Sequence, residues 1–196
     1  YWIGDKVKSL IRMNLDGSND RIVFNGPFNN SAFEIKAKGD QVWVASGGYT
    51  STWAKRWLQG GAFYYTNNRW SFINNWNTEA LDTISDIVCI AIDPTNTSKV
   101  FIGTYDEGIL EIENFKLKNI YTHTNSSLGQ LLGYKYVYVT GLAFDSKNNL
   151  WAANSGAGNM LSVKTTKDEW YSFNIGNSNL SHIMVDDNDY KWILNR

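Results

Sequence analysis

The chain has a single cysteine among its 196 residues, which excludes an intrachain disulfide framework. Cys89 lies in the apolar run at residues 87–90, which predicts a small buried side chain. No segment reaches the roughly 18 consecutive apolar residues that a membrane-spanning helix needs. The net charge is −1, so we expect no overall field that would attract nucleic acid or an anionic membrane.

Catalytic motifs are also missing. The two histidines, His123 and His182, lie far apart and lack the neighbours of a metal or catalytic site. There is no HExxH, no phosphate-binding glycine loop and no Gly-x-Ser-x-Gly elbow. A propeller enzyme would need carboxylates that converge near the axis, whereas Asp106 and Glu107 are single loop residues. We therefore predict no catalytic residue, no cofactor and no metal, and a protein that is not an enzyme.

What the chain does contain is a repeat built on an aromatic residue. Tryptophan or phenylalanine recurs five times in one local setting, at spacings of 41, 58, 50 and 41 residues: Trp2, Trp43, Phe101, Trp151 and Trp192. Periods of roughly 40–50 residues, with several short strands in each unit, are typical of β-propeller blades. A small residue follows the ring in four of the five copies. We expect the ring to pack against a glycine or alanine of the neighbouring blade.

Each unit divides into four short stretches of alternating apolar residues, which predicts four half-buried strands. In three copies the first stretch ends on an aspartate, which is Asp93, Asp145 or Asp186. Residues that favour turns follow each of these aspartates. The two prolines, Pro27 and Pro94, fall between or after strands, where a missing donor costs little. No amphipathic helix is evident. The predicted fold class is all-β, a β-propeller of four-stranded antiparallel blades.

The repeats predict three complete blades and two partial ones. The expected boundaries are 1–31 (partial), 32–77, 78–125, 126–177 and 178–196 (partial). Because propellers usually close with four to eight blades, we expect a fragment of a larger, seven-bladed ring, cut at Tyr1 inside a repeat. The alternative is a four-bladed ring in which the two end pieces share one blade. An open arc would expose apolar blade edges, through which it would associate with another copy or with further sequence.

The acidic segment at residues 186–189 could suggest calcium, which prefers clustered oxygen ligands. It lacks the glycine and the distal glutamate of an EF-hand loop. It also occupies the position that Asp93 and Asp145 take in other units, so we predict a hairpin turn there.

The units resemble the two-component-regulator propeller repeat, whose core reads roughly Asn-x-Leu-Trp-Ile-Gly-Thr, followed by Gly-Leu and an aromatic strand. Residues 149–153 and 100–110 match it best, and Leu194 departs from the small residue. The same repeat builds the periplasmic sensor halves of hybrid histidine kinases that detect oligosaccharides.

Two longer stretches, residues 42–49 and 90–108, resemble the PorZ family of propeller proteins in the type IX secretion system of Bacteroidetes. The resemblance implies two seven-bladed propellers, a C-terminal β-domain and surface exposure together with the secretion sortase. It also implies a role in delivering anionic lipopolysaccharide for attachment to secreted cargo. It transfers no catalytic motif.

The most unusual segment is an insertion at residues 47–61, between the second and third strands of a blade. Loops on a rigid β scaffold often carry binding sites. Two tryptophans flank a basic pair here, so the rings could stack on sugars and the cations could pair with anionic groups. Alternatively Trp53 and Trp57 lie on one face of a short helical turn and anchor the loop. The candidate ligand- or partner-binding residues are Tyr49, Trp53, Lys55, Arg56, Trp57, Tyr105 and Asp106.

The sequence therefore favours a non-enzymatic binding module, located in the periplasm or on the outer-membrane surface of a Gram-negative bacterium. Its expected partner is a glycan, an anionic lipopolysaccharide or a protein of the secretion system. The alternative is the periplasmic ligand-sensing propeller of a hybrid two-component sensor kinase.

Overall fold

The computed structural model describes residues 1–5, 9–22, 25–27, 29–176 and 179–196. Within these residues the only helix is the 3-10 turn Glu79–Leu81 (η1), and the rest is strands and loops. The strands up to η1 are β1 (Trp2–Asp5), β2 (Ser9–Met13), β3 (Asn19–Ile22), β4 (Glu34–Lys38), β5 (Gln41–Ala45), β6 (Ala62–Thr66) and β7 (Arg69–Ile73). The strands after η1 are β8 (Ile87–Ile92), β9 (Lys99–Asp106), β10 (Ile109–Glu113), β11 (Lys116–Tyr121), β12 (Val137–Phe144), β13 (Leu150–Ser155), β14 (Leu161–Lys164), β15 (Trp170–Phe173), β16 (Leu180–Val185) and β17 (Lys191–Asn195). The all-β prediction is confirmed.

Consecutive strands pair antiparallel and build four-stranded meanders. One sheet has the order β4-β5-β6-β7, and the sets β8–β11 and β12–β15 form two more. These last two sets are hydrogen-bonded to each other, because the end of β9 pairs with the start of β12 through Tyr105 and Tyr138. A three-stranded sheet, β1–β3, precedes the meanders, and a two-stranded sheet, β16–β17, comes after them. The predicted four-stranded antiparallel blades are therefore present.

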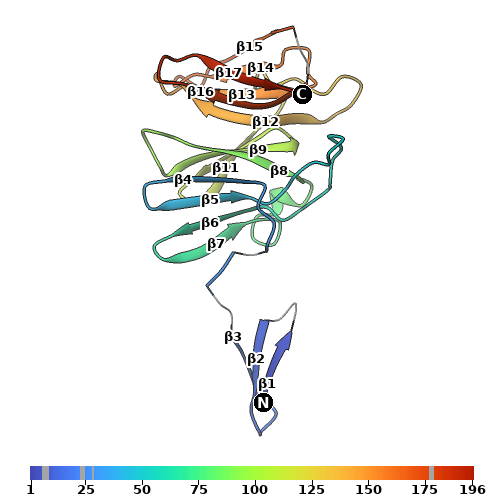
Figure 1. Ribbon diagram of the computed structural model, residues 1–196, viewed down its shortest axis with the longest axis vertical. Helices are drawn as coiled ribbons and strands as arrows, with labels where there is room; N and C mark the ends of the chain where they lie inside the picture. Colours follow the sequence, from blue (N-terminus) through green and yellow to red (C-terminus); the bar gives the residue numbers. More distant parts are fainter. Residues whose placement is uncertain (6–8, 23–24, 28, 177–178) are drawn as a thin grey trace.

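The meanders stack as successive layers along the long axis of the molecule (Figure 1). The first strands of successive blades, β4, β8, β12 and β16, contact one another. The β1–β3 sheet lies at the opposite end of the molecule from β16–β17 (Figure 1). The alternative in which the two end pieces share one blade is therefore wrong for this structure.

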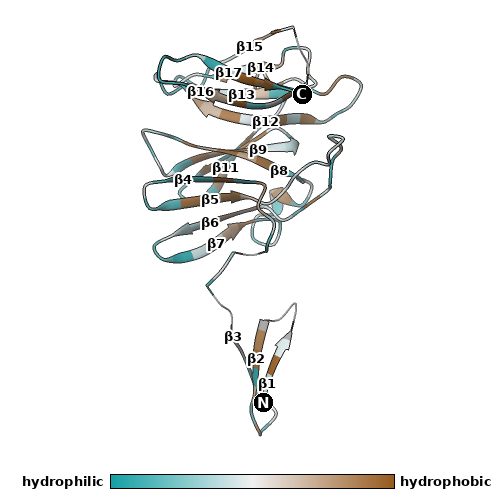
Figure 2. Cartoon of the chain, viewed as in Figure 1, coloured by the Kyte–Doolittle hydropathy of each residue, from teal (hydrophilic) through white to brown (hydrophobic). Residues whose placement is uncertain are grey.

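Hydrophobic residues concentrate in the strands of the stacked layers (Figure 2). In two units the repeated ring packs against a ring of the following layer. Trp43 on β5 is 1% exposed and stacks on Tyr64 of its own blade and on Phe115 of the next, with ring centroids 4.8 and 6.0 Å away. Phe101 on β9 contacts Phe144 on β12 edge to face at 5.8 Å. The expected packing of ring against glycine or alanine is thus corrected, since these rings meet rings of the following blade.

The small residue after the ring allows a strand of the next blade to pack closely against this strand. Gly103, two residues after Phe101, faces β12. A Cβ added there would lie 2.9 Å from a methyl carbon of Val139 and closer still to the Sγ of Cys89. Cys89 is buried, as predicted, and its thiol lies 3.4 Å from the carbonyl oxygen of Val139. Close contact between strands of neighbouring blades therefore requires glycine at this position.

The aspartates that end the first strands organise the hairpins after them. Asp145 Oδ1 accepts the backbone N–H groups of Lys147 and Asn149, while its Oδ2 accepts the indole N–H of Trp151 at 2.9 Å. Asp186 repeats the pattern and accepts the indole N–H of Trp192 at 2.8 Å. The predicted turn at residues 186–189 is confirmed. The recurrence of Asp and Trp in these two units has one cause, because each of the two carboxylates binds both its turn and the ring six residues later.

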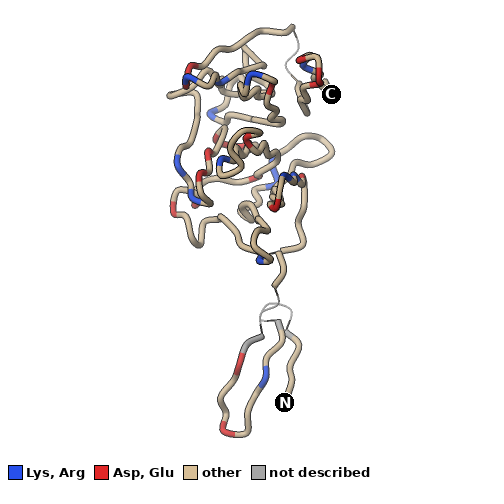
Figure 3. Tube along the Cα trace, turned by 90° about the vertical axis from the view of Figure 1, so that its left-hand side faces the viewer, with Lys and Arg blue, Asp and Glu red and all other residues tan. Residues whose placement is uncertain are grey.

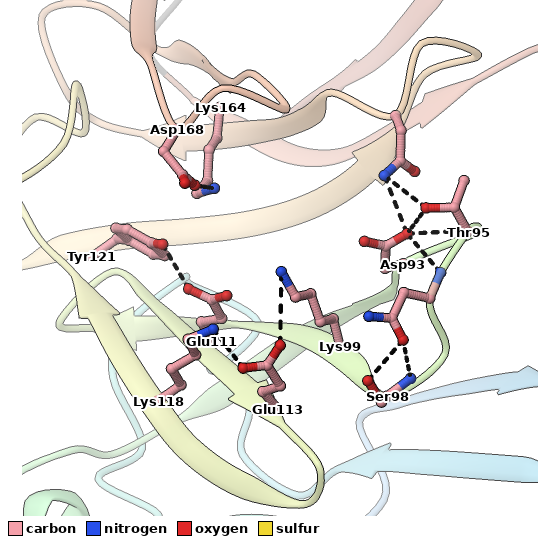
Figure 4. Close-up of polar contacts among 12 residues, drawn as sticks. Asp93, Thr95, Ser98, Lys99, Glu111, Glu113, Lys118, Tyr121, Lys164 and Asp168 are labelled. Atoms are coloured by element: carbon pink, nitrogen blue, oxygen red, sulfur yellow. Dashed lines mark hydrogen bonds and ion pairs between the residues drawn. The ribbon is translucent and has the colours of Figure 1, made fainter.

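Basic and acidic residues are interspersed along the chain (Figure 3), in keeping with the small net charge. Figure 4 shows a cluster of charged residues where the blade β8–β11 meets the blade β12–β15. Glu111 accepts the Tyr121 hydroxyl at 2.6 Å, and Glu113 lies within ion-pair distance of Lys99 and Lys118. Across the junction Lys164 pairs with Asp168. These pairs each lie within one blade, while the side-chain amide of Asn148 crosses the junction and donates to Asp93 and Thr95 at 3.2 Å. We therefore interpret the cluster as structural.

Candidate functional site

The insertion at residues 47–61 is fixed to the scaffold by one buried carboxylate. Asp86, directly before β8, is 0% exposed. Its Oδ2 accepts the N–H groups of Arg56 and Trp57 at 2.9 and 2.8 Å, and its Oδ1 accepts that of Leu58 at 3.0 Å. The Asp86 N–H donates back to the carbonyl of Leu58. Four hydrogen bonds to one residue therefore hold the second half of the loop in place.

The backbone of the insertion is not helical. Trp53 and Trp57 have φ angles of 63° and 60°, in the left-handed region that a side chain with a Cβ seldom occupies. A tight turn precedes Trp57, in which Trp53 donates to the carbonyl of Thr50 and Thr50 donates to that of Ala54. The expectation of a short helical turn with both rings on one face is therefore wrong. Each left-handed residue instead reverses the chain locally.

Lys55 lies inside a cage of neighbouring side chains. Its ammonium pairs with the carboxylate of Asp106, and both side chains are almost fully buried. The nitrogen also lies 4.0 Å from the ring centroid of Trp57 and 4.3 Å from that of Tyr136. The other oxygen of Asp106 accepts the N–H and the hydroxyl of Ser85. The Lys55 charge is thus neutralised within the protein.

Aromatic rings continue from the insertion onto two strands. Tyr49 stacks on Trp53, with centroids 4.4 Å apart, and lies 5.1 Å from Tyr105 at the end of β9. Tyr105 stacks on Tyr138 of β12 at 3.7 Å with nearly parallel planes. The same row extends through Tyr136 to Tyr134, at centroid distances of 6.0 and 6.4 Å. The row crosses from one blade to the next at the point where β9 and β12 pair.

Burial changes the chemistry of these phenols. It raises the pKa of Tyr49 to about 12, although Arg196 opposes the shift, and it raises the pKa of Tyr138 to about 12. Burial also raises the pKa of Tyr105. These hydroxyls therefore remain protonated at physiological pH and can donate hydrogen bonds.

A guanidinium from a distant part of the chain joins the cluster. The Cζ of Arg196, just after β17, lies 3.9 Å from the ring centroid of Trp53. Its Nη2 donates to the hydroxyls of Ser155 and Tyr105 at 2.7 and 3.3 Å. Among the ion pairs of the described residues, none involves Arg196. Its partners here are neutral.

These groups line an open cavity of about 670 Å³. Its walls include the rings of Trp53, Trp57, Tyr105, Tyr136 and Tyr138, together with Lys55 and Arg196. Cavities of this size that combine aromatic walls with a few polar groups are typical of small-ligand sites. In the described part of the chain, no group of three or more histidine, cysteine or acidic side chains is placed to hold a metal ion. No described helix is long and apolar enough to cross a membrane.

The structure brings most of the candidate residues together and separates one. Tyr49, Trp53, Lys55, Trp57, Tyr105 and Asp106 form one contact network. Arg56 is different, because its exposed side chain lies beside Gly48 and is not part of the cavity wall. Arg196 and the tyrosines at 134, 136 and 138 were not predicted from the sequence. The alternation of these tyrosines, which runs into the first strand of a blade, is a signal of a one-sided aromatic surface that could have been recognised.

No protein-family model matches the sequence, and no protein of curated function matches it. Solved structures do. PorZ, described as an essential bacterial surface component of the type IX secretion system of Porphyromonas gingivalis, superposes with a TM-score of 0.79 at 20% identity. The match covers 95% of this chain and 26% of PorZ.

The extracellular domain of a putative hybrid two-component system from B. thetaiotaomicron matches with a TM-score of 0.59 at 17% identity, over 99% of this chain and 24% of that one. An enzyme, virginiamycin B lyase from Staphylococcus aureus, matches with a TM-score of 0.62 at 16% identity, over 99% of this chain and 59% of the lyase. The chain thus spans about a quarter of the first two structures. At these identities the likeness concerns the fold, and it confirms that the chain is built from β-propeller blades.

Proposed function

We propose that the chain is a non-enzymatic binding module of an extracytoplasmic, PorZ-like protein, which contacts an anionic glycan or lipopolysaccharide, or a protein partner, in type IX secretion. The observation that carries the proposal is the aromatic cavity between the insertion and the start of β12. Aromatic faces stack on sugar rings, and neutral phenols supply hydrogen bonds to hydroxyl groups.

Binding fits the cavity better than hydrolysis does. Glycoside hydrolysis generally uses a pair of carboxylates that flank the scissile bond. The residues described along this cavity wall include no aspartate or glutamate. Asp106 lies behind the wall, where Lys55 and Ser85 occupy its two oxygens. Glu107 has a raised pKa because of burial and the neighbouring Asp106, but it is a single group.

The extracytoplasmic location rests on the structural neighbours, which are described as a surface component and as an extracellular domain. The likeness to the second of these supports an alternative function, the sensing of a ligand for a two-component system. The two functions differ in the event that binding triggers. Co-purification with secretion-system proteins would favour the first, and ligand-dependent transcription of nearby genes would favour the second.

The experiment that tests binding is a titration of purified protein with bacterial surface polysaccharides, comparing Trp57→Ala with Trp2→Ala. Trp57 is 62% exposed at the cavity, while Trp2 is 59% exposed on the distant β1–β3 sheet. Loss of one stacked ring costs about 1–3 kcal/mol. We therefore expect roughly tenfold weaker binding for Trp57→Ala and wild-type binding for Trp2→Ala. Equal affinities of both variants for every ligand and partner would contradict the proposed site.

The two rings of the insertion should respond differently. Trp53 is half-buried, packs between Tyr49 and Arg196, and accepts the Tyr105 hydroxyl at its carbonyl. Trp53→Ala should lower the free energy of unfolding by about 2–3 kcal/mol, somewhat below the cost for a fully buried ring. Trp57→Ala should lower it by less than about 1 kcal/mol. Urea unfolding of both variants measures the difference, and a large loss for Trp57→Ala would make it an anchoring residue.

A further inference from the structure

We propose that the cavity binds the carboxylate of an acidic sugar, a uronic acid, and that Arg196 is the residue that pairs with it. This inference rests on the proposed function and names both its ligand class and the residue that recognises the charge. The sequence pointed instead to the adjacent pair Lys55 and Arg56.

Neither of those two cations is suited to the task. The Lys55 ammonium is paired with Asp106 and covered by Trp57 and Tyr136, so a ligand anion would have to displace an internal carboxylate. Breaking such a buried pair is strongly unfavourable, because it leaves a buried charge without its partner. Arg56 extends over Gly48, outside the cavity wall.

Arg196 has the opposite properties. Its guanidinium lies on the Trp53 ring at the cavity wall, and its hydrogen-bond partners are two hydroxyl groups. Partly buried charges usually have a counter-charge, and none of the ion pairs described in this chain supplies one. Both of its hydrogen bonds use Nη2, which leaves the donors of Nη1 for a ligand. A planar carboxylate matches the guanidinium in charge and in geometry.

The surroundings favour a singly charged sugar. Only one positive charge at the cavity is not balanced internally, so a phosphate dianion would bring one negative charge with no partner. The pyranose ring attached to the carboxylate would meet Trp57, the most exposed ring of the insertion. The protonated hydroxyl of Tyr138 borders the same space and can donate to a sugar oxygen, whereas the Tyr105 hydroxyl already donates its hydrogen to the carbonyl of Trp53.

The test is isothermal titration of the protein with trimers of galacturonic, glucuronic and mannuronic acid, each compared with its methyl ester. The ester keeps the ring and removes the charge. Arg196→Gln is the test variant. Arg56→Gln, which removes an arginine of the insertion that lies outside the cavity wall, is the matched control. Arg196→Lys retains the charge without the planar fork. Melting temperatures of all variants identify any change caused by misfolding.

We expect at least one acid to bind roughly tenfold more tightly than its ester, with this advantage lost in Arg196→Gln, reduced in Arg196→Lys and retained in Arg56→Gln. Higher salt should reduce the difference in affinity between the acid and its ester. A uronate-bearing lipopolysaccharide with and without its lipid identifies the source. Equal binding of both forms assigns the glycan chain alone, and preference for the intact form assigns a lipid-linked glycan.

Two results would overturn the inference and leave the proposed function standing. They are equal binding of acid and ester, and unchanged affinity in Arg196→Gln, in either case with Trp57→Ala still weakening binding to a glycan. Absence of binding to every charged and neutral glycan, together with no partner sensitive to Trp57→Ala, would overturn both.

Discussion

At the scale of single residues, the aspartates after the first strands carry a predictable dependence on pH. Burial alone would raise the pKa of Asp145, but hydrogen bonds from Trp151, Asn149 and Lys147 outweigh it and lower the pKa. At Asp186 the hydrogen bond from Trp192 is the largest cause of a lowered pKa. A carboxyl group with a lower pKa in the folded state than in the unfolded state stabilises the fold only while it is ionised.

The contribution of Asp145 is therefore complete above its ordinary pKa of 3.8 and is lost as the pH falls below that value. We expect the difference in unfolding free energy between the wild type and Asp145→Asn to be largest near neutral pH and to shrink towards about pH 3. Urea unfolding at both pH values measures it, with Asp187→Asn as the control. A gap that stays constant with pH would contradict the role of the ionised form.

At the scale of elements, the insertion depends on Asp86 for its shape. Asp86→Asn tolerates the same left-handed backbone, φ 52°, but directs an amide group with donor hydrogens towards N–H groups that need an acceptor. We expect a loss of about 1.5–3 kcal/mol of stability. The amides of residues 56–58 should exchange with solvent at least tenfold faster, as hydrogen exchange with mass spectrometry would show. Unchanged exchange there would mean that other contacts hold the loop.

The elements also show what the sequence could predict and what it could not. Blades were predictable because Trp43, Phe101 and Trp151 recur within alternating strands, and the alternation results from the pleat of a half-buried sheet. The insertion could be located from the sequence, but its shape could not be predicted, because the repeat supplies no template for it. Its shape depends on left-handed tryptophans and on a contact with Arg196, more than a hundred residues away along the chain. The shape of the insertion could not be predicted because it depends on packing between residues that are far apart in the sequence.

At the scale of the whole molecule, contacts between blades decide stability, and Gly103 tests them. Gly103→Ala would press a methyl group against Val139 and Cys89 of two neighbouring first strands. Overpacking of this kind costs about 1–3 kcal/mol. Gly158→Ala is the control, because nothing lies within 4 Å of its added Cβ and its backbone is not left-handed. Urea unfolding should show a clear loss for the first variant and little change for the second.

The β1–β3 sheet should behave differently from the stacked blades. It lies at one end of the molecule, away from the layers, and exposes Trp2, Ile3 and Met13 (Figure 1). A small sheet gains stability mainly by burying one face, and this sheet buries little. We expect the amides of β2 to exchange orders of magnitude faster than those of β8, all of whose residues are buried. If β2 is instead as protected as β8, another surface must cover this sheet. Exposed sheet edges favour association with a second copy of the chain. If a second copy covers this sheet, the protection of the β2 amides from exchange should disappear on dilution. Protection that does not depend on protein concentration would contradict self-association through this sheet.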